Sequence, residues 1–202
     1  MFITIEGGEG AGKTTQARLL ADALRASGRA VLLTREPGGA PGAEILRTLL
    51  LRGDHRWSPA AEVHLHFAAR AEHLACAILP ALDADQVVVC DRFADSTLAY
   101  QGYGQGADLA LIAVLTRLLP RQPDLSLMLR IDPRLGAARL ESRRTATDRY
   151  EAMDAAFHAR VAAGFASIAA ADPTRCRTID ADGTPESVHA AILATVLPCL
   201  RA

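Results

Sequence analysis

Short apolar runs alternate with longer amphipathic stretches along the whole chain. Each run is rich in Val, Ile and Leu and ends near Gly, Pro or a charged residue, as is typical of strands that are buried on both faces. The runs lie at 2–5, 30–34, 87–90, 125–131 and, least regularly, 176–180. They predict the strands of a central sheet.

The stretches between these runs carry apolar residues at helical spacing. Leu19, Leu20 and Leu24 share one side of the first stretch, and Ser58 followed by Pro59 is typical of a helix N-terminus. We expect helices at 14–25, 44–51, 59–82, 108–119, 133–142, 151–171 and from 184 onward. The alternation predicts an α/β fold, an open five-stranded parallel sheet flanked by helices, with ligands at the carboxyl ends of the strands.

The first apolar run leads directly into a glycine-rich loop. Residues 7–14 read GGEGAGKT and fit the pattern G-x-x-x-x-G-K-[ST], a P-loop. In this pattern backbone N–H groups cradle phosphates at a helix N-terminus, the lysine reaches the terminal phosphates and the hydroxyl binds Mg²⁺. The alternative is a glycine-rich turn that binds nothing. The predicted ATP-binding residues are Gly7, Gly8, Glu9, Gly10, Ala11, Gly12, Lys13, Thr14 and Thr15.

Composition narrows the class of protein further. With 50% hydrophobic residues and a formal net charge of -1, the 202 residues favour one folded domain with no overall attraction to nucleic acid or membrane. The cysteines are far apart and form no C-x-x-C pair, which argues against a metal or disulfide framework. No signal-peptide pattern follows Met1, and no apolar run approaches membrane-spanning length. We therefore expect a cytoplasmic protein.

Four segments after the P-loop carry a family resemblance. They read TREPGG at 34–39, FAAR at 67–70, DRFADS at 91–96 and AYQG at 99–102. In this order and spacing, the chain resembles thymidylate kinases of the bacterial type over nearly its whole length. The resemblance implies a P-loop kinase fold that transfers the γ-phosphoryl of ATP to dTMP with Mg²⁺, giving ADP and dTDP. It also implies a homodimer formed through long helices.

The resemblance places an acceptor site on specific residues. Arg47, Arg70 and Arg92 match the positions that bind the acceptor phosphate, Glu9 matches the residue that contacts the sugar, and Gln101 can read a pyrimidine edge. An ordinary solvated charge is the alternative for Arg47 and Glu9. The full set of predicted dTMP-binding residues is Glu9, Arg35, Pro37, Arg47, His66, Phe67, Arg70, Arg92, Ser96, Gln101 and Tyr103. Tyr103 is either a pocket wall or plain loop packing.

One position departs from the family pattern. The family has an aromatic residue, usually Phe, four residues before the helix arginine, and it stacks on thymine. Counting back from Arg70 gives His66, with Phe67 one position further along. A neighbour on a helix points about 100° away, so Phe67 cannot simply replace it. A neutral imidazole can stack on a base, and the choice between His66 and Phe67 stays open.

Phosphoryl transfer needs cations placed against the phosphates. The predicted catalytic residues are Lys13, Asp91, Arg92, Arg143 and Arg144. Thr14 and Asp91 are the predicted metal ligands, although Asp91 could instead orient Arg92. Some family members carry Arg in the P-loop at the place of Gly10, so a lid at about 142–150 is expected to supply that cation here.

The lid prediction has an alternative, and so does the function. The basic stretch at 143–149 could be a solvated loop, with Arg149 as a structural member. A second reading of the function is another nucleoside monophosphate or deoxynucleoside kinase. A third is a nucleotide-dependent switch or a non-enzymatic ATP-binding module. The chain contains no N-K-x-D, and its one D-x-x-G, at 180–183, lies at the wrong end for a GTPase.

Overall fold

Five parallel strands form the sheet at the centre of the computed structural model, which describes residues 1–52, 55–142 and 149–200. The strand order is β2-β3-β1-β4-β5, and every neighbouring pair is parallel. The predicted five-stranded parallel sheet is confirmed. The strands are β1 (Phe2–Gly7), β2 (Val31–Arg35), β3 (Val87–Asp91), β4 (Leu125–Arg130) and β5 (Cys176–Asp180).

The helices follow the predicted order with three differences. The predicted 59–82 helix consists of α3, a π-helical turn η1 and α4 in direct succession. The predicted 151–171 helix begins later, at Ala155, where the Asp154 side chain caps the helix by accepting a hydrogen bond from Phe157 N. A short helix α5 and a π-helix η2 were not predicted. The helical elements are α1 (Lys13–Ala26), α2 (Pro41–Arg52), α3 (Pro59–His73), η1 (Leu74–Ile78), α4 (Leu79–Asp83), α5 (Ala94–Thr97), η2 (Leu98–Gly104), α6 (Leu109–Arg117), α7 (Pro133–Ser142), α8 (Ala155–Ala171) and α9 (Pro185–Cys199).

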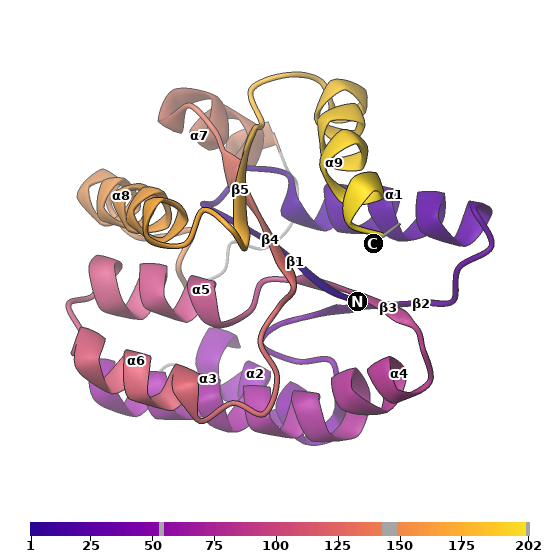
Figure 1. Ribbon diagram of the computed structural model, residues 1–202. Helices are drawn as coiled ribbons and strands as arrows, with labels where there is room; N and C mark the ends of the chain where they lie inside the picture. Colours follow the sequence, from indigo (N-terminus) through magenta and orange to yellow (C-terminus); the bar gives the residue numbers. More distant parts are fainter. Residues whose placement is uncertain (53–54, 143–148, 201–202) are drawn as a thin grey trace.

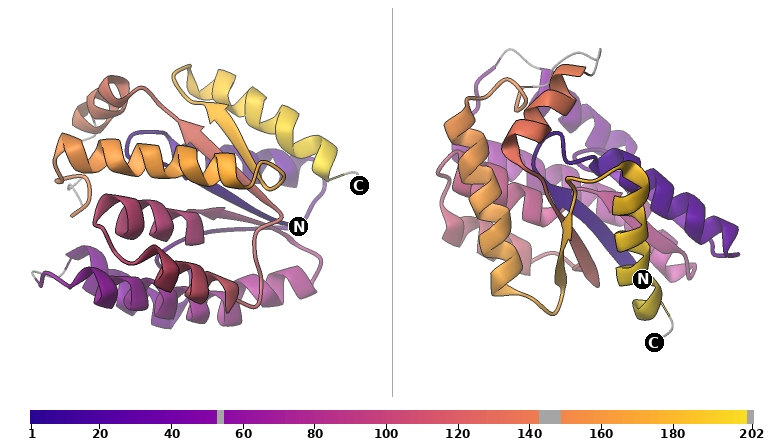
Figure 2. Two further views of the ribbon diagram at one scale, coloured as in Figure 1. Left: turned by 60° about the vertical axis from the view of Figure 1, so that its left-hand side comes forward. Right: turned by 90° about the horizontal axis from the view of Figure 1, so that it is seen from above.

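Helices cover both faces of the sheet (Figures 1 and 2). On one face, Ile3, Ile5 and Leu127 pack with residues of α1 and α9. On the other face, Phe2 and Val88 pack with η1, α4 and α5, and Met128 packs with η2 and α8. Side chains alternate between the faces of a strand, so a continuous apolar run fills both cores.

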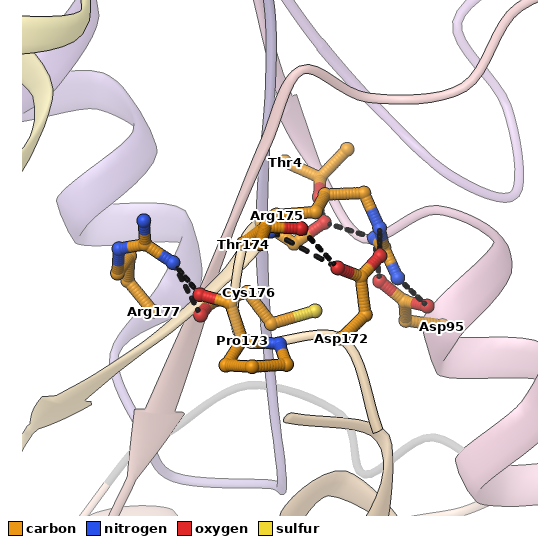
Figure 3. A network of polar contacts seen from close by, with 9 residues as sticks. Thr4, Asp95, Asp172, Pro173, Thr174, Arg175, Cys176 and Arg177 are labelled. Carbon is orange, nitrogen blue, oxygen red and sulfur yellow. Dashed lines mark hydrogen bonds and ion pairs between the residues drawn. The ribbon is translucent and has the colours of Figure 1, made fainter. Parts of the chain in front are cut away.

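A polar network around Arg175 fixes the start of β5 (Figure 3). Its guanidinium donates to Asp95 Oδ2 at 2.6 Å, to Ser126 Oγ at 2.6 Å and to Asp172 Oδ2 at 3.0 Å. Ser126 Oγ in turn lies 2.8 Å from Thr4 Oγ1 on β1. The network therefore joins the α8–β5 turn to the central strands and to α5, which carries part of the site described below. Among the described residues, no helix is both long enough and apolar enough to span a bilayer.

Candidate active site

The P-loop joins the carboxyl end of β1 to the N-terminus of α1. Gly10 and Gly12 have φ angles of 73° and 85°, which favour glycine. Lys13 Nζ donates to the Gly8 carbonyl at 2.6 Å. Burial and the nearby Arg92 charge lower the pKa of Lys13 to about 8, although neighbouring carboxylates raise it. Residues 9–16 line one side of a cavity, the P-loop cavity, with Asp91 and Arg92 beside them.

Thr14 and Asp91 both line the P-loop cavity and contact each other. Thr14 Oγ1 donates to Asp91 Oδ2 at 2.5 Å, and Asp91 Oδ1 is buried with no partner among the described residues. A hydroxyl and an unsatisfied carboxylate oxygen are ligands that suit Mg²⁺, which takes its remaining ligands from water and phosphate. The described residues contain no cluster of three or more His, Cys, Asp or Glu that could hold a metal by themselves. This pair fits an ion that binds together with a phosphate ligand.

Arg92 follows β3 in a left-handed conformation, with a φ of 72°. That conformation costs a non-glycine residue about 1–2 kcal/mol, and such strain is commonly found at functional sites. The side chain donates to Glu9 Oε1 at 2.6 Å and to the Gly7 carbonyl at 3.2 Å, and it lies over the Tyr100 ring at 4.8 Å. The conformation thus turns the guanidinium toward the P-loop.

The carboxylate of Glu9 is held beside this arginine. Burial raises the pKa of Glu9, but the charges of Arg92 and Lys13 and a hydrogen bond from Tyr100 outweigh it and bring the pKa to about 2. The Tyr100 hydroxyl donates to Glu9 Oε1 at 2.7 Å. Glu9 is therefore ionised, and its negative charge is engaged by the neighbouring donors Arg92 and Tyr100.

A second cavity, the inner pocket, opens beside the first. Glu9, Glu36, Arg47 and Arg92 line both cavities, so the two cavities meet at these residues. Of the predicted dTMP-binding residues, those that line the inner pocket are Glu9, Pro37, Arg47, His66, Arg70, Arg92, Ser96 and Gln101. Arg35 instead lines the P-loop cavity, and its guanidinium donates to Glu44.

Hydrogen bonds hold two of the three guanidinium nitrogens of Arg70, and the third has no partner among the described residues. Its side chain is only 2% exposed. Nε donates to Glu36 Oε2 at 2.7 Å and one terminal nitrogen donates to Thr97 Oγ1 at 3.1 Å. The other terminal nitrogen is buried with no partner among the described residues. Because a buried donor without a partner is costly, this nitrogen is a strong candidate to bind a ligand in the inner pocket. Arg47 is anchored at the same pocket by a 2.6 Å hydrogen bond to the Pro37 carbonyl.

His66 lines the inner pocket, whereas Phe67 and Tyr103 are not among the described residues that line it. Phe67 packs with Val63 and other apolar residues between α3 and α6, and Tyr103 lies against α8. Burial, followed by the charges of Arg70, Arg149 and Arg92, lowers the pKa of His66 to about 3. The imidazole is therefore neutral at the pH of most assays. The geometry favours His66 over Phe67 as the residue that faces a ligand.

The predicted lid residues are only partly described. Arg143 and Arg144 lie outside the described residues. Arg149 donates to Glu62 Oε2 at 2.5 Å. A Cβ at Gly10 would lie 2.3 Å from the carbonyl oxygen of Gly136 on α7. The P-loop of this structure therefore has no room for a side chain at position 10.

Several lining and supporting residues were not predicted. They are Glu36, Glu62, Thr97, Tyr100, Arg139, Tyr150, Gly183, Pro185 and Val188. One signal was available for Glu62, because Glu62, His66 and Arg70 are spaced four residues apart and share one face of α3. Tyr150 and Arg139 gave no such signal, because the fold brings them to the site from distant parts of the chain.

Comparison with known proteins shows the family to which this chain belongs. A family model described as thymidylate kinase matches residues 5–192. The thymidylate kinase of Gluconobacter oxydans (strain 621H) is 59% identical over 97% of this chain and 94% of the relative, and that of Caulobacter vibrioides is 50% identical over 95% and 93%. The crystal structure of thymidylate kinase from Ehrlichia chaffeensis matches with a TM-score of 0.79 and 34% identity, over 97% of this chain and 98% of that chain. On this evidence the chain belongs to the thymidylate kinase family.

Proposed function

We propose that this protein transfers the γ-phosphoryl group of ATP to dTMP, giving ADP and dTDP. The observation that carries the proposal is the meeting of two cavities at Arg92, one built on a P-loop and the other lined by Arg47 and Arg70. An oxygen of the acceptor phosphate attacks the γ-phosphorus, and the bond from that phosphorus to the β-bridging oxygen breaks. A reaction of this kind needs two phosphates held in line between cations.

The P-loop cavity takes the donor. The backbone N–H groups of residues 8–14 and the Lys13 ammonium bind the phosphates, and Arg92 lies where charge moves between donor and acceptor. Thr14 and Asp91 would hold Mg²⁺, which neutralises charge on the phosphate oxygens when it is bound. Arg139 also lines this cavity and donates to three carbonyls at 181–183, and its flat guanidinium is suited to stack on the adenine ring.

The inner pocket takes dTMP. Arg47 and the partnerless nitrogen of Arg70 supply donors for its phosphate, with Arg92 beside them. The neutral ring of His66 stacks on thymine, and Gln101 reads its edge. Glu9, fixed by Arg92 and Tyr100, accepts a hydrogen bond from the sugar.

Three further features belong to the same proposal. The protein acts as one domain in the cytoplasm, with a lid at about 142–150 that brings Arg143 or Arg144 to the transferring phosphoryl group. It forms a homodimer on the side of α2, α3 and α6. Support for the dimer comes from exposed apolar side chains on α2 and at the end of α6, with Ile45 67% and Leu118 74% exposed.

The test is a panel of nucleoside monophosphates with purified protein, ATP and Mg²⁺. We expect ADP release to be fastest with dTMP and the product to be dTDP. A higher kcat/KM for another monophosphate would assign the protein to a different acceptor. ADP release that no monophosphate stimulates would instead favour a nucleotide switch or an ATP-binding module.

A further inference from the structure

Glu62 lies on α3 behind the inner pocket and is fully buried. Its Oε1 accepts hydrogen bonds from Gln101 Nε2 at 2.9 Å, Gln105 Nε2 at 2.8 Å and the Tyr150 hydroxyl at 2.6 Å. Its Oε2 accepts from Arg149 at 2.5 Å. Glu62 itself is not among the described residues that line the pocket. One buried carboxylate therefore accepts hydrogen bonds from η2, from Gln105 directly after η2 and from the segment before α8.

The carboxylate fixes the direction of every hydrogen bond around it. A carboxylate paired with an arginine only accepts, so the Gln101 amide must present its nitrogen, not its oxygen, to Glu62. The hydroxyl proton of Tyr150 is likewise donated to Glu62. The Tyr150 oxygen also accepts from the Gln101 amide nitrogen, which lies 3.0 Å away. The amide nitrogen of Gln101 is therefore engaged by two acceptors inside the protein.

The same chain of donors sets the tautomer of His66. Its Nε2 lies 3.2 Å from the Tyr150 oxygen, and the proton of that hydroxyl is already committed to Glu62. The neutral imidazole must therefore carry its proton on Nε2 and donate it to Tyr150. Two residues that line the inner pocket, His66 and Gln101, are thus oriented by Glu62 through Tyr150.

The side-chain oxygen of Gln101 is left as a free acceptor. Its Oε1 has no partner among the described residues, and Gln101 lines the inner pocket. Thymine and uracil carry a hydrogen on N3 that can be donated to this oxygen. Cytosine presents a lone pair at N3 and would place two acceptors against each other, which costs the binding energy of an unmet buried acceptor.

We infer that Glu62 is a specificity-determining residue: by orienting the Gln101 amide, it selects pyrimidine monophosphates that carry N3–H over those of cytosine. The inference rests on the proposed function, because it assigns the base edge that the inner pocket reads. Glu62 acts through Gln101 and is a positioning residue.

The test is Glu62→Gln, which keeps the shape of the side chain but offers Gln101 both a donor and an acceptor. Either orientation of the Gln101 amide then becomes possible. We expect the ratio of kcat/KM for dTMP over dCMP to fall about 10- to 100-fold, which is the value of one oriented buried hydrogen bond. The ratio for dTMP over dUMP should stay within about twofold, because both bases carry N3–H. Calorimetric dissociation constants for the three nucleotides give the same comparison without turnover.

Glu72→Gln is the matched control, since Glu72 lies on the same helix and its carboxylate accepts a hydrogen bond from Cys76 outside the inner pocket. It should change neither ratio. Tyr150→Phe provides a second variant if Glu62→Gln does not fold. It removes the contact between the Gln101 nitrogen and Tyr150 and keeps the ring, so the dTMP over dCMP ratio should fall by a smaller factor, roughly three- to tenfold.

Three outcomes would overturn the inference about Glu62. A folded Glu62→Gln protein that keeps the wild-type dTMP over dCMP ratio overturns the inference, and dTMP turnover by the wild type would still support the proposed function. Equal falls in the dTMP over dCMP and dTMP over dUMP ratios would indicate general loosening of the pocket and would also overturn the inference. A wild type that binds dCMP better than dTMP overturns the proposed function together with the inference.

Discussion

The buried His66 should make the protein lose stability in mild acid. Burial and three nearby arginines lower the pKa of His66 from 6.5 to about 3 in the folded protein. In the unfolded chain the imidazole is exposed and takes up a proton as the pH falls through its ordinary value. The unfolded state then binds more protons than the folded state, so the free energy of unfolding decreases as the pH falls from about 6.5 toward 3.

The expected loss can be worked out from the two pKa values. Proton linkage by this one group reduces the free energy of unfolding by about 0.2 kcal/mol at pH 7 and by about 2 kcal/mol at pH 5. The difference between these two pH values, about 2 kcal/mol, hardly depends on the folded-state pKa as long as it lies below about 4. Measurement at pH 5 therefore tests the burial of the neutral ring, not the exact pKa.

The assay is urea unfolding of wild type, His66→Gln and His64→Gln at pH 7 and pH 5. His64 is an exposed histidine two positions earlier on α3, so its replacement controls for the loss of a histidine from this helix. Wild type and His64→Gln should lose about 2 kcal/mol more between the two pH values than His66→Gln. Equal losses in all three proteins would refute the burial of a neutral His66.

The other predictions concern catalysis, assembly and the sheet. Lys13→Ala should lower kcat about 10²-fold or more with a near-normal unfolding midpoint, because the proposed role of the ammonium is to bind phosphate; wild-type turnover would contradict this. The Arg143→Ala/Arg144→Ala double variant should lower kcat while the dissociation constant of dTMP changes little, and full kcat would refute the lid hypothesis. Sedimentation at micromolar concentration should show a dimer, and a species of only 21.4 kDa would count against it. Arg175→Met should cost about 2–3 kcal/mol in urea unfolding, because it leaves the largely buried Asp95 without its partner; a loss below about 0.5 kcal/mol would show that the network contributes little.

The sheet was predictable because its signal is local. Each strand is an apolar run whose two faces are both covered, and the loop at 7–14 carries its chemistry in a fixed spacing. The π-helix η2 was missed, since its wider turn follows from packing against α8 and has no pattern of its own in the sequence. The start of α8 was placed too early, because the polar residues before Asp154 fit a helix as well as a turn.

The sequence identified residues of the site only where one short motif supplies both the functional side chain and its place in the fold. Arg70, Arg92 and Gln101 were found in short motifs, and all three line the inner pocket. The partners that orient them come from elsewhere in the chain. Glu36 lies on the loop after β2, and Tyr150 lies far from Gln101 in sequence, so neither pairing can be read from spacing. Both His66 and Phe67 are buried, but only His66 of the two lines the inner pocket, on the face of α3 that it shares with Glu62 and Arg70.

The contact between the P-loop and α7 supports the proposal that the lid supplies a cation. At Gly10, a side chain would collide with the backbone of Gly136, so the loop cannot carry its own arginine in this structure. That close approach brings α7 against the phosphate site. Its last residue, Ser142, lines the P-loop cavity, and Arg143 follows it directly in the chain. The same packing that excludes a side chain from position 10 therefore brings the last described residue before the proposed lid to the P-loop cavity, which agrees with the proposal that the lid supplies the cation.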